Sequence, residues 1–182
     1  MLEHAQIRQI LPQRHPMLLL DRVVSIEPGV SIRAIKAVSA CEPCYAGLPD
    51  GLDPDSYAYP VSLLIESFGQ AAAVLWLVST ASQRDSRPDK GAGPAADAPG
   101  NAAGDDIFLF GAARDCVIES PAYPGDVLCH TARLGRVLDG AALVAGEILV
   151  GHRRIAVMGS LIAAIRPART IPRRGGTHHG IT

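Results

Sequence analysis

The amino-acid sequence predicts a single α+β domain in which one long apolar helix is wrapped by a curved antiparallel sheet. Residues 61–78, VSLLIESFGQAAAVLWLV, form an apolar stretch of helical length, and strand-like segments with turn signals lie on both sides of it. The chain has 182 residues, of which 48% are apolar and 19% charged, enough for one domain with a core. A helix that is apolar nearly all round must be buried, and a curved sheet is the partner that the strands can provide.

Two strands are expected before the helix. Residues 1–16 hold a short helical segment that proline residues end. A first strand is expected over Met17–Ile26 and a second over Ser31–Ser39, joined by a Glu-Pro-Gly turn. Residues 40–60 are rich in Gly, Pro and Asp, so we expect an irregular segment there. Ser62 is the expected N-cap of the helix.

The apolar segment 61–78 is also long enough to be considered as a membrane span. It carries Glu66 and Gln70 one helical turn apart, and no basic residue flanks it to orient insertion. We therefore expect a buried core helix and no membrane span. The N-terminal sequence MLEHAQIRQI lacks the apolar region of a secretory signal, so the expected location is cytoplasmic.

After the helix, residues 83–106 combine Gly, Pro, Ala and charged residues without periodicity, which predicts a flexible inserted loop. The sequence then predicts a meander of three or four long strands. The expected strand segments are 107–110, 114–120, 127–138, 141–150 and 153–165. Residues 167–182 are expected to form a disordered basic tail, so the single domain should span residues 1–166.

Charge and composition exclude several classes of function. Seventeen Lys and Arg against eighteen Asp and Glu give a formal net charge of −1, without the basic excess typical of nucleic-acid-binding proteins. Four cysteines are too few for a disulfide scaffold. Cys41-Glu-Pro-Cys44 has the spacing of a zinc half-site but lacks a second pair of ligands. We expect neither a metal nor a cofactor.

Four short motifs follow one another in the order in which a known family has them. Residues 10–23, ILPQRHPMLLLDRV, are similar to LPHRYPFLLVDRV, and residues 34–38 with Glu42-Pro43 to a second strand followed by NEPFF. Residues 59–71, YPVSLLIESFGQA, are similar to MPGVLIIEALAQA, and residues 123–126, YPGD, to VPGD. These are motifs of the FabZ-type (3R)-hydroxyacyl-acyl-carrier-protein dehydratases, which the chain therefore resembles.

The resemblance covers about residues 7–165, with 83–106 as an insertion, and implies the hot-dog fold and water elimination from a 3-hydroxyacyl thioester. In this family a histidine removes the α-proton, a carboxyl group on the central helix protonates the leaving hydroxyl, and an N–H at the helix N-terminus polarises the thioester carbonyl. Glu66 matches the carboxyl group, and Gln70 matches the helix glutamine that helps to hold the polar network of the site. The alternative for Gln70 is an amide that is only hydrogen-bonded within the core. Val61 stands at the helix entrance, where the family has glycine.

The family histidine lies in a GHFPG loop, and the corresponding residues here are AGLPDG, 46–51. Leu48 occupies the position of the missing histidine and cannot act as a base. The remaining histidines, including His130 and His152 on the expected meander, are expected to be structural or solvated. Glu66 is the only charged residue of the apolar helix. Its alternative role is that of a stabilising acid near a helix N-terminus.

The family site lies at a two-fold interface, with histidine from one protomer and the acid from the other. A chain with Glu66 and no family histidine could therefore complete a site with a His-bearing hot-dog relative, as part of a heteromeric dehydratase in fatty-acid or polyketide biosynthesis. Two alternatives stay open: a non-catalytic acyl-binding or scaffolding subunit, and a hot-dog thioesterase or isomerase that uses Glu66. The expected partners are an acyl carrier protein carrying a 3-hydroxyacyl thioester and a second hot-dog chain, in a homo- or heterodimer, with no nucleic acid.

Overall fold

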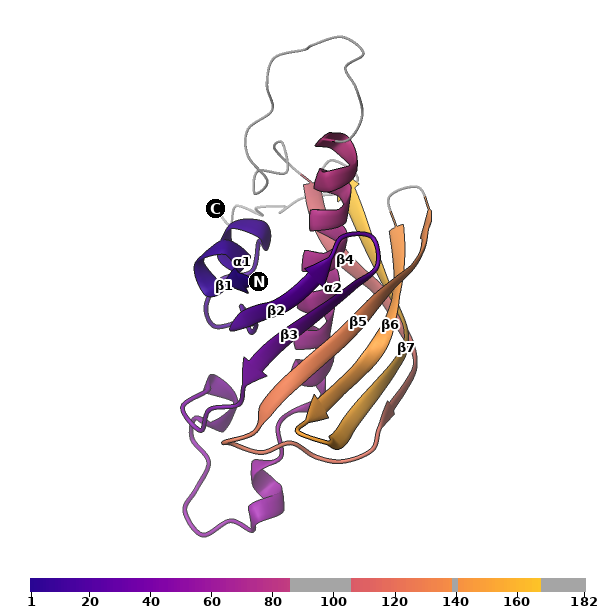
Figure 1. The fold of residues 1–182 in the computed structure, drawn as a ribbon. Helices are drawn as coiled ribbons and strands as arrows, with labels where there is room; N and C mark the ends of the chain where they lie inside the picture. The colour runs from indigo at the N-terminus through magenta and orange to yellow at the C-terminus, as the bar shows by residue number, and fades with distance from the viewer. Residues whose placement is uncertain (86–105, 139–140, 168–182) are drawn as a thin grey trace, which may run out of the picture.

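One antiparallel sheet curves around one long helix in the computed structural model, which describes residues 1–85, 106–138 and 141–167 (Figure 1). In chain order the elements are β1 (Leu2–Glu3), α1 (His4–Ile10), β2 (Arg22–Glu27), β3 (Ser31–Ala37), the 3₁₀ turns Pro43–Tyr45 and Pro54–Tyr57, α2 (Val61–Asp85), β4 (Asp106–Ile118), β5 (Val127–Leu138), β6 (Ala141–Val150) and β7 (Arg153–Pro167). The seven strands follow the order β1-β2-β3-β5-β6-β7-β4. The expected α+β class is confirmed.

Helix α2 is buried through most of its length because its inward face is made of small residues. Ala71, Ala72 and Ala73 have 0% exposure, as does Phe68 one turn earlier. Small side chains allow the sheet to approach the helix closely. The segment Pro54–Gln83 is long and apolar enough to cross a membrane, but 61% of its most apolar window is buried inside the fold. That burial is typical of a core helix.

Helix α2 differs from the expected helix at both ends. It begins at Val61, directly after Pro60, so Ser62 lies in the first turn and the expected N-cap was wrong. It also continues past residue 78 to Asp85, and Ser79 in this extension is buried and bonded: its hydroxyl donates to the Leu75 carbonyl (2.5 Å) and accepts from the Gly29 amide (2.6 Å). This contact joins the helix to the turn between β2 and β3.

The strand expected over Met17–Ile26 begins only at Arg22. Residues 17–19 do not join the sheet ladder, because the amides of residues 17 and 18 bond the Arg14 carbonyl and a side chain of α2 bonds two further backbone groups. The Gln70 side chain accepts from the Leu19 amide and donates to the Met17 carbonyl. Leu19 and Leu20 are buried, at 6% and 0% exposure. Their apolar character is therefore explained by contact with the core rather than by a strand.

The two strands expected at 107–110 and 114–120 are one strand, β4, because both parts pair with β7. The register shifts between Phe110 and Ala112, where the sequence pattern had suggested a break. The expected loop 83–106 also has different bounds, since residues 83–85 belong to α2 and Asp106 to β4. The expected tail 167–182 begins one residue too early, since Pro167 is the last residue of β7. Residues 86–105 and 168–182, which contain the rest of the expected loop and tail, lie outside the described residues.

Candidate active site

Glu66 and Gln70 lie one turn apart on α2 and are bonded to each other. Gln70 Nε2 donates a hydrogen bond of 2.9 Å to Glu66 Oε1. Gln70 has 0% exposure, whereas Glu66 is half-buried. Among the residues that the structure describes, no donor bonds the second carboxylate oxygen of Glu66. Glu66 therefore has one hydrogen-bonded carboxyl oxygen and one without a hydrogen bond, at the edge of the core.

The orientation of the Gln70 amide is determined by the backbone of residues 17–19. The Leu19 N–H can only donate, so the group facing it at 2.9 Å must be the amide oxygen. The NH₂ group then faces the Met17 carbonyl at 2.6 Å and Glu66 Oε1 at 2.9 Å, and both are acceptors. Every polar atom of this buried amide is thus bonded. The N-terminal segment, Gln70 and Glu66 form one connected unit, which fixes the Glu66 carboxyl group in place.

Replacing Gln70 by leucine is expected to destabilise the fold by about 1–3 kcal/mol, because the Met17 carbonyl and the Leu19 amide would lose their partner. Urea unfolding of the purified chain measures the change. Gln83→Leu, the same substitution at an exposed position of α2, serves as the control and should change the free energy of unfolding little. Equal effects of the two variants would contradict the role of Gln70 as a buried connector.

Val61, the third expected site residue, is the first residue of α2, with a side chain that is 46% exposed. Its N–H is one of the four at the helix start that have no acceptor within the helix. The start of α2 therefore offers a free donor and the positive end of the helix dipole less than two turns before Glu66. A carboxyl group and a backbone donor on one helix can together move a proton and stabilise a developing negative charge.

Leu48 is not brought to this pair. It is 38% exposed and lies in the loop 43–58, which extends beyond the end of the sheet where α2 begins (Figure 1). Its backbone amide donates a hydrogen bond to the Tyr45 carbonyl. In the part of the chain that the structure describes, Leu48 makes no hydrogen bond to Glu66.

The structure does not place His130 where it could act as a base beside the Glu66–Gln70 pair. It has 0% exposure and packs edge-on against Phe68, with ring centroids 6.3 Å apart. Phe68 is two residues from Glu66 and so points about 200° around the helix from it. Burial, followed by the nearby positive charge of Lys36, lowers the pKa of His130 to about 3. His130 is a buried structural residue, as the sequence analysis expected.

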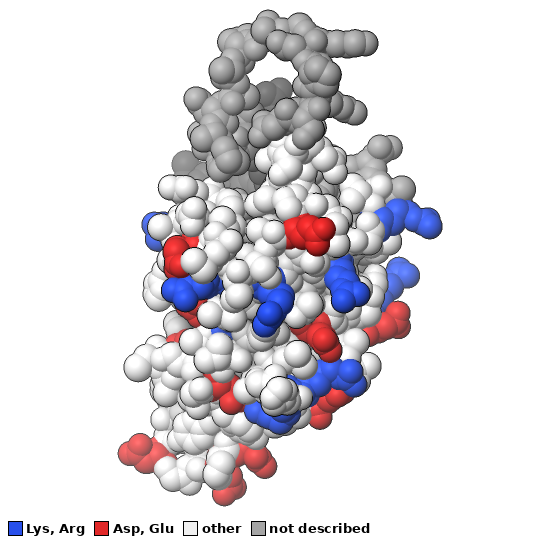
Figure 2. All heavy atoms as spheres, viewed as in Figure 1, with Lys and Arg blue, Asp and Glu red and all other residues white. Residues whose placement is uncertain are grey.

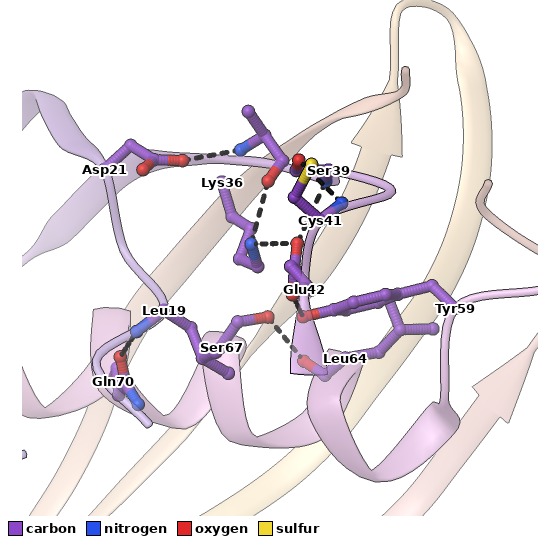
Figure 3. A network of polar contacts seen from close by, with 11 residues as sticks. Leu19, Asp21, Lys36, Ser39, Cys41, Glu42, Tyr59, Leu64, Ser67 and Gln70 are labelled. Atoms are coloured by element: carbon purple, nitrogen blue, oxygen red, sulfur yellow. Dashed lines mark hydrogen bonds and ion pairs between the residues drawn. The ribbon is translucent and has the colours of Figure 1, made fainter. Parts of the chain in front are cut away.

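The sequence analysis did not find a buried polar cluster that lies next to the start of α2. Glu42 accepts hydrogen bonds from both Lys36 and Tyr59 at the end of β3 (Figure 3). The available signal was Lys36, which the alternation of β3 places on the inward face with Ile32 and Ala34. A lysine on a buried face requires a counter-ion.

The remaining polar groups point to no further chemistry. Acidic and basic side chains are interspersed over the face shown in Figure 2. In the described parts of the chain, no group of three His, Cys, Asp or Glu residues could hold a metal ion. Cys41 and Cys44 are both free thiols.

Comparison with known proteins places the chain in a family. No family model matches it. It is 33% identical over 156 residues to the 3-hydroxyacyl-[acyl-carrier-protein] dehydratase FabZ of a Nitratiruptor species, and the match covers 82% of this chain and 92% of the relative. The chain belongs to the FabZ family. The FabZ of Actinobacillus pleuropneumoniae serotype 5b is 29% identical over 154 residues, covering 85% of each protein.

The fold of this FabZ-family chain also matches solved structures. The dehydratase heterocomplex ApeI:P from Xenorhabdus doucetiae superposes with a TM-score of 0.62 at 20% identity, covering 92% of this chain and 91% of that one. The hot-dog fold and the FabZ resemblance inferred from the sequence motifs are both confirmed. The FabZ family is one of dehydratases, which favours water elimination over the thioesterase and isomerase alternatives.

Proposed function

We propose that this chain is the acid-bearing subunit of a two-chain 3-hydroxyacyl-ACP dehydratase whose base is a histidine of a second hot-dog chain. The observation that carries the proposal is the Glu66–Gln70 pair: its carboxyl group is held in place, and no described histidine contacts it. FabZ membership supplies the reaction type. Leu48 stands in the position of the family base and cannot remove a proton, which is why we propose that the base comes from a second chain.

The proposed reaction removes water from carbons 2 and 3 of the acyl chain. The partner histidine takes the proton from carbon 2, and the electrons of that bond form the new double bond. The bond from carbon 3 to its hydroxyl breaks, and Glu66 donates the proton with which the hydroxyl leaves as water. Negative charge develops on the thioester oxygen, where the N–H of Val61 would stabilise it.

A second chain has a suitable place to bind. Strand β4 is an edge of the sheet, since it pairs with β7 only. Its last two residues, Val117 and Ile118, are 55% and 37% exposed. An apolar edge strand is a site for pairing with another strand. The solved ApeI:P structure is a dehydratase heterocomplex, so assembly from two different chains has a precedent on this fold.

The substrate we propose is an acyl carrier protein carrying a 3-hydroxyacyl thioester, since the FabZ relatives act on substrates bound to acyl carrier protein. The process would be fatty-acid or polyketide biosynthesis in the cytoplasm. Arg14 and Arg33 are exposed and could attract an acidic carrier protein. Lys36 cannot, because it is 5% exposed and paired with Glu42.

The test compares the chain alone with its complex with a His-bearing hot-dog chain from the same organism. Water loss from a 3-hydroxyacyl carrier protein is followed by mass spectrometry. We expect turnover by the complex, little by the chain alone, and none once the partner's base is replaced by alanine. Full activity of the chain alone, or of the complex after that replacement, would contradict the proposal. Binding without turnover would instead support the scaffolding alternative.

A further inference from the structure

A single buried carboxylate lies where β3, the loop 43–58 and the start of α2 meet. Figure 3 shows Glu42 between Lys36 and Tyr59. The Glu42 side chain is 15% exposed and that of Lys36 is 6% exposed. Tyr59 has 3% exposure. These three residues, which we call the Glu42 cluster, are separate from the Glu66–Gln70 pair.

Each oxygen of Glu42 is bonded to a different part of the chain. Oε1 accepts from Lys36 Nζ at 2.8 Å and from the Ser39 amide at 3.0 Å. Oε2 accepts from the Tyr59 hydroxyl at 2.9 Å. Lys36 Nζ also donates to the Ala37 carbonyl at 2.8 Å and lies 5.6 Å from the centre of the Tyr59 ring. The buried charges are therefore paired and hydrogen-bonded, as low dielectric surroundings require.

The cluster joins the two ends of the loop 43–58. Ser39 and Glu42 precede the loop, and Tyr59 follows it, so the carboxylate closes the loop at its base. Tyr59 is held a second time, because its amide donates to the Ala122 carbonyl at 2.7 Å. Only Pro60 separates Tyr59 from Val61, the first residue of α2. The carboxylate thus fixes the position from which the helix starts.

The Tyr59 hydroxyl is a permanent donor in this cluster. Burial, together with the hydrogen bond to Glu42, raises the pKa of Tyr59 well above its usual range. The phenol therefore stays protonated over the pH range in which proteins are stable, and it remains a hydrogen-bond donor to Glu42.

We propose that Glu42 is a positioning residue, which through Tyr59 fixes the entrance of α2 and the base of the loop 43–58 as one rigid unit. The positions of Val61 and Glu66 both depend on where α2 starts, so Glu42 would act on catalysis through them. This effect of Glu42 on catalysis rests on the proposed function. A displacement of about 1 Å at a reacting group can lower a rate by about 10²-fold. The effect on rigidity does not depend on the function.

The test uses two substitutions that each remove one phenol–carboxylate bond from the same loop. Tyr59→Phe breaks the bond to Glu42 and leaves the Lys36–Glu42 ion pair intact. Tyr123→Phe, the matched control, breaks the 3.0 Å bond to Asp55 in the 3₁₀ turn Pro54–Tyr57 of the loop. Hydrogen–deuterium exchange of the purified chain is measured over residues 43–58 and over the first turns of α2.

We expect Tyr59→Phe to speed amide exchange about tenfold at the loop base and at the hydrogen-bonded amides that open α2, those of Leu63 and Leu64, which donate to the Pro60 carbonyl. Tyr123→Phe should affect only the residues around Asp55. Equal exchange patterns in the two variants, or no change in Tyr59→Phe, would overturn the proposal. If Tyr59→Phe does not fold, Glu42→Asp keeps the charge beside Lys36 while withdrawing the carboxylate from Tyr59, and the same pattern is expected.

In the active complex, Tyr59→Phe should lower kcat about tenfold with KM little changed, since the substrate is still bound but the acid and the helix donor are misplaced. An unchanged kcat together with faster exchange would refute the catalytic consequence. Absence of activity in the unsubstituted complex would instead count against the proposed function, and the exchange measurement would still decide the role of Glu42.

Discussion

Replacing Glu66 by glutamine is expected to lower the turnover of the working dehydratase by about 10²- to 10⁴-fold. The amide has the shape of the carboxyl group, and its oxygen can still accept the 2.9 Å bond from Gln70 Nε2. It cannot release a proton to the leaving hydroxyl. The complex should therefore assemble normally and bind its substrate, but fail in the chemical step. The measurement is kcat of the complex, with sedimentation and thermal melting to verify assembly.

Glu27→Gln provides the matched control for this variant. Glu27 is an exposed glutamate at the end of β2 and takes no part in the α2 site. The same chemical change there should leave kcat, assembly and melting temperature close to those of the unsubstituted protein. Turnover that survives Glu66→Gln would remove the acid role and favour the non-catalytic, scaffolding alternative.

Acidification from pH 7 to pH 5 is expected to destabilise the fold through His130 by about 2 kcal/mol. Burial, and then the charge of Lys36, lowers the pKa of His130 to about 3, whereas in the unfolded chain the ring titrates near its ordinary value of 6.5. Below pH 6.5 the unfolded chain therefore binds a proton that the folded chain does not. The free energy of unfolding falls as pH decreases from 6.5 towards 3, and it is unaffected by this group above 6.5.

His130→Leu tests this assignment, because leucine keeps an apolar contact with Phe68 and has no proton to bind. Urea unfolding at pH 7 and pH 5 should show a smaller loss of stability in the variant than in the unsubstituted protein. The side chains facing His130 from the neighbouring strands, Ala34 on β3 and Ile148 on β6, cannot titrate. Identical pH dependence in both proteins would show that His130 is protonated without cost in the folded state.

The core of the fold could be predicted from local patterns. Period-two alternation over residues 31–37 and the Asp-Gly turn after 138 predicted strands that the structure contains. Failures occurred where a distant side chain overrides the local pattern. Residues 17–19 look like a strand but bond to Gln70, and the part of the helix past residue 78 is bonded to the turn between β2 and β3 through Ser79 and Gly29.

The candidate site could be predicted only in part, for the same reason. Glu66 and Gln70 were identified because residues four apart on a helix lie on one face, and their 2.9 Å bond agrees with that spacing. The Glu42 cluster was not found, because Lys36, Glu42 and Tyr59 belong to a strand, a loop and a helix entrance. No sequence period connects them.

The sequence by itself determined the α+β class, the buried helix that carries Glu66, and the FabZ resemblance, because apolar periodicity and short motifs are properties of neighbouring residues. Only the tertiary structure decided which buried polar groups have partners. Gln70 is bonded at every polar atom and Lys36 is paired with Glu42, whereas neither ring nitrogen of the buried His130 has a hydrogen-bond partner among the described residues. The free energy of a buried polar group depends on atoms brought close by folding, and the sequence does not record those distances.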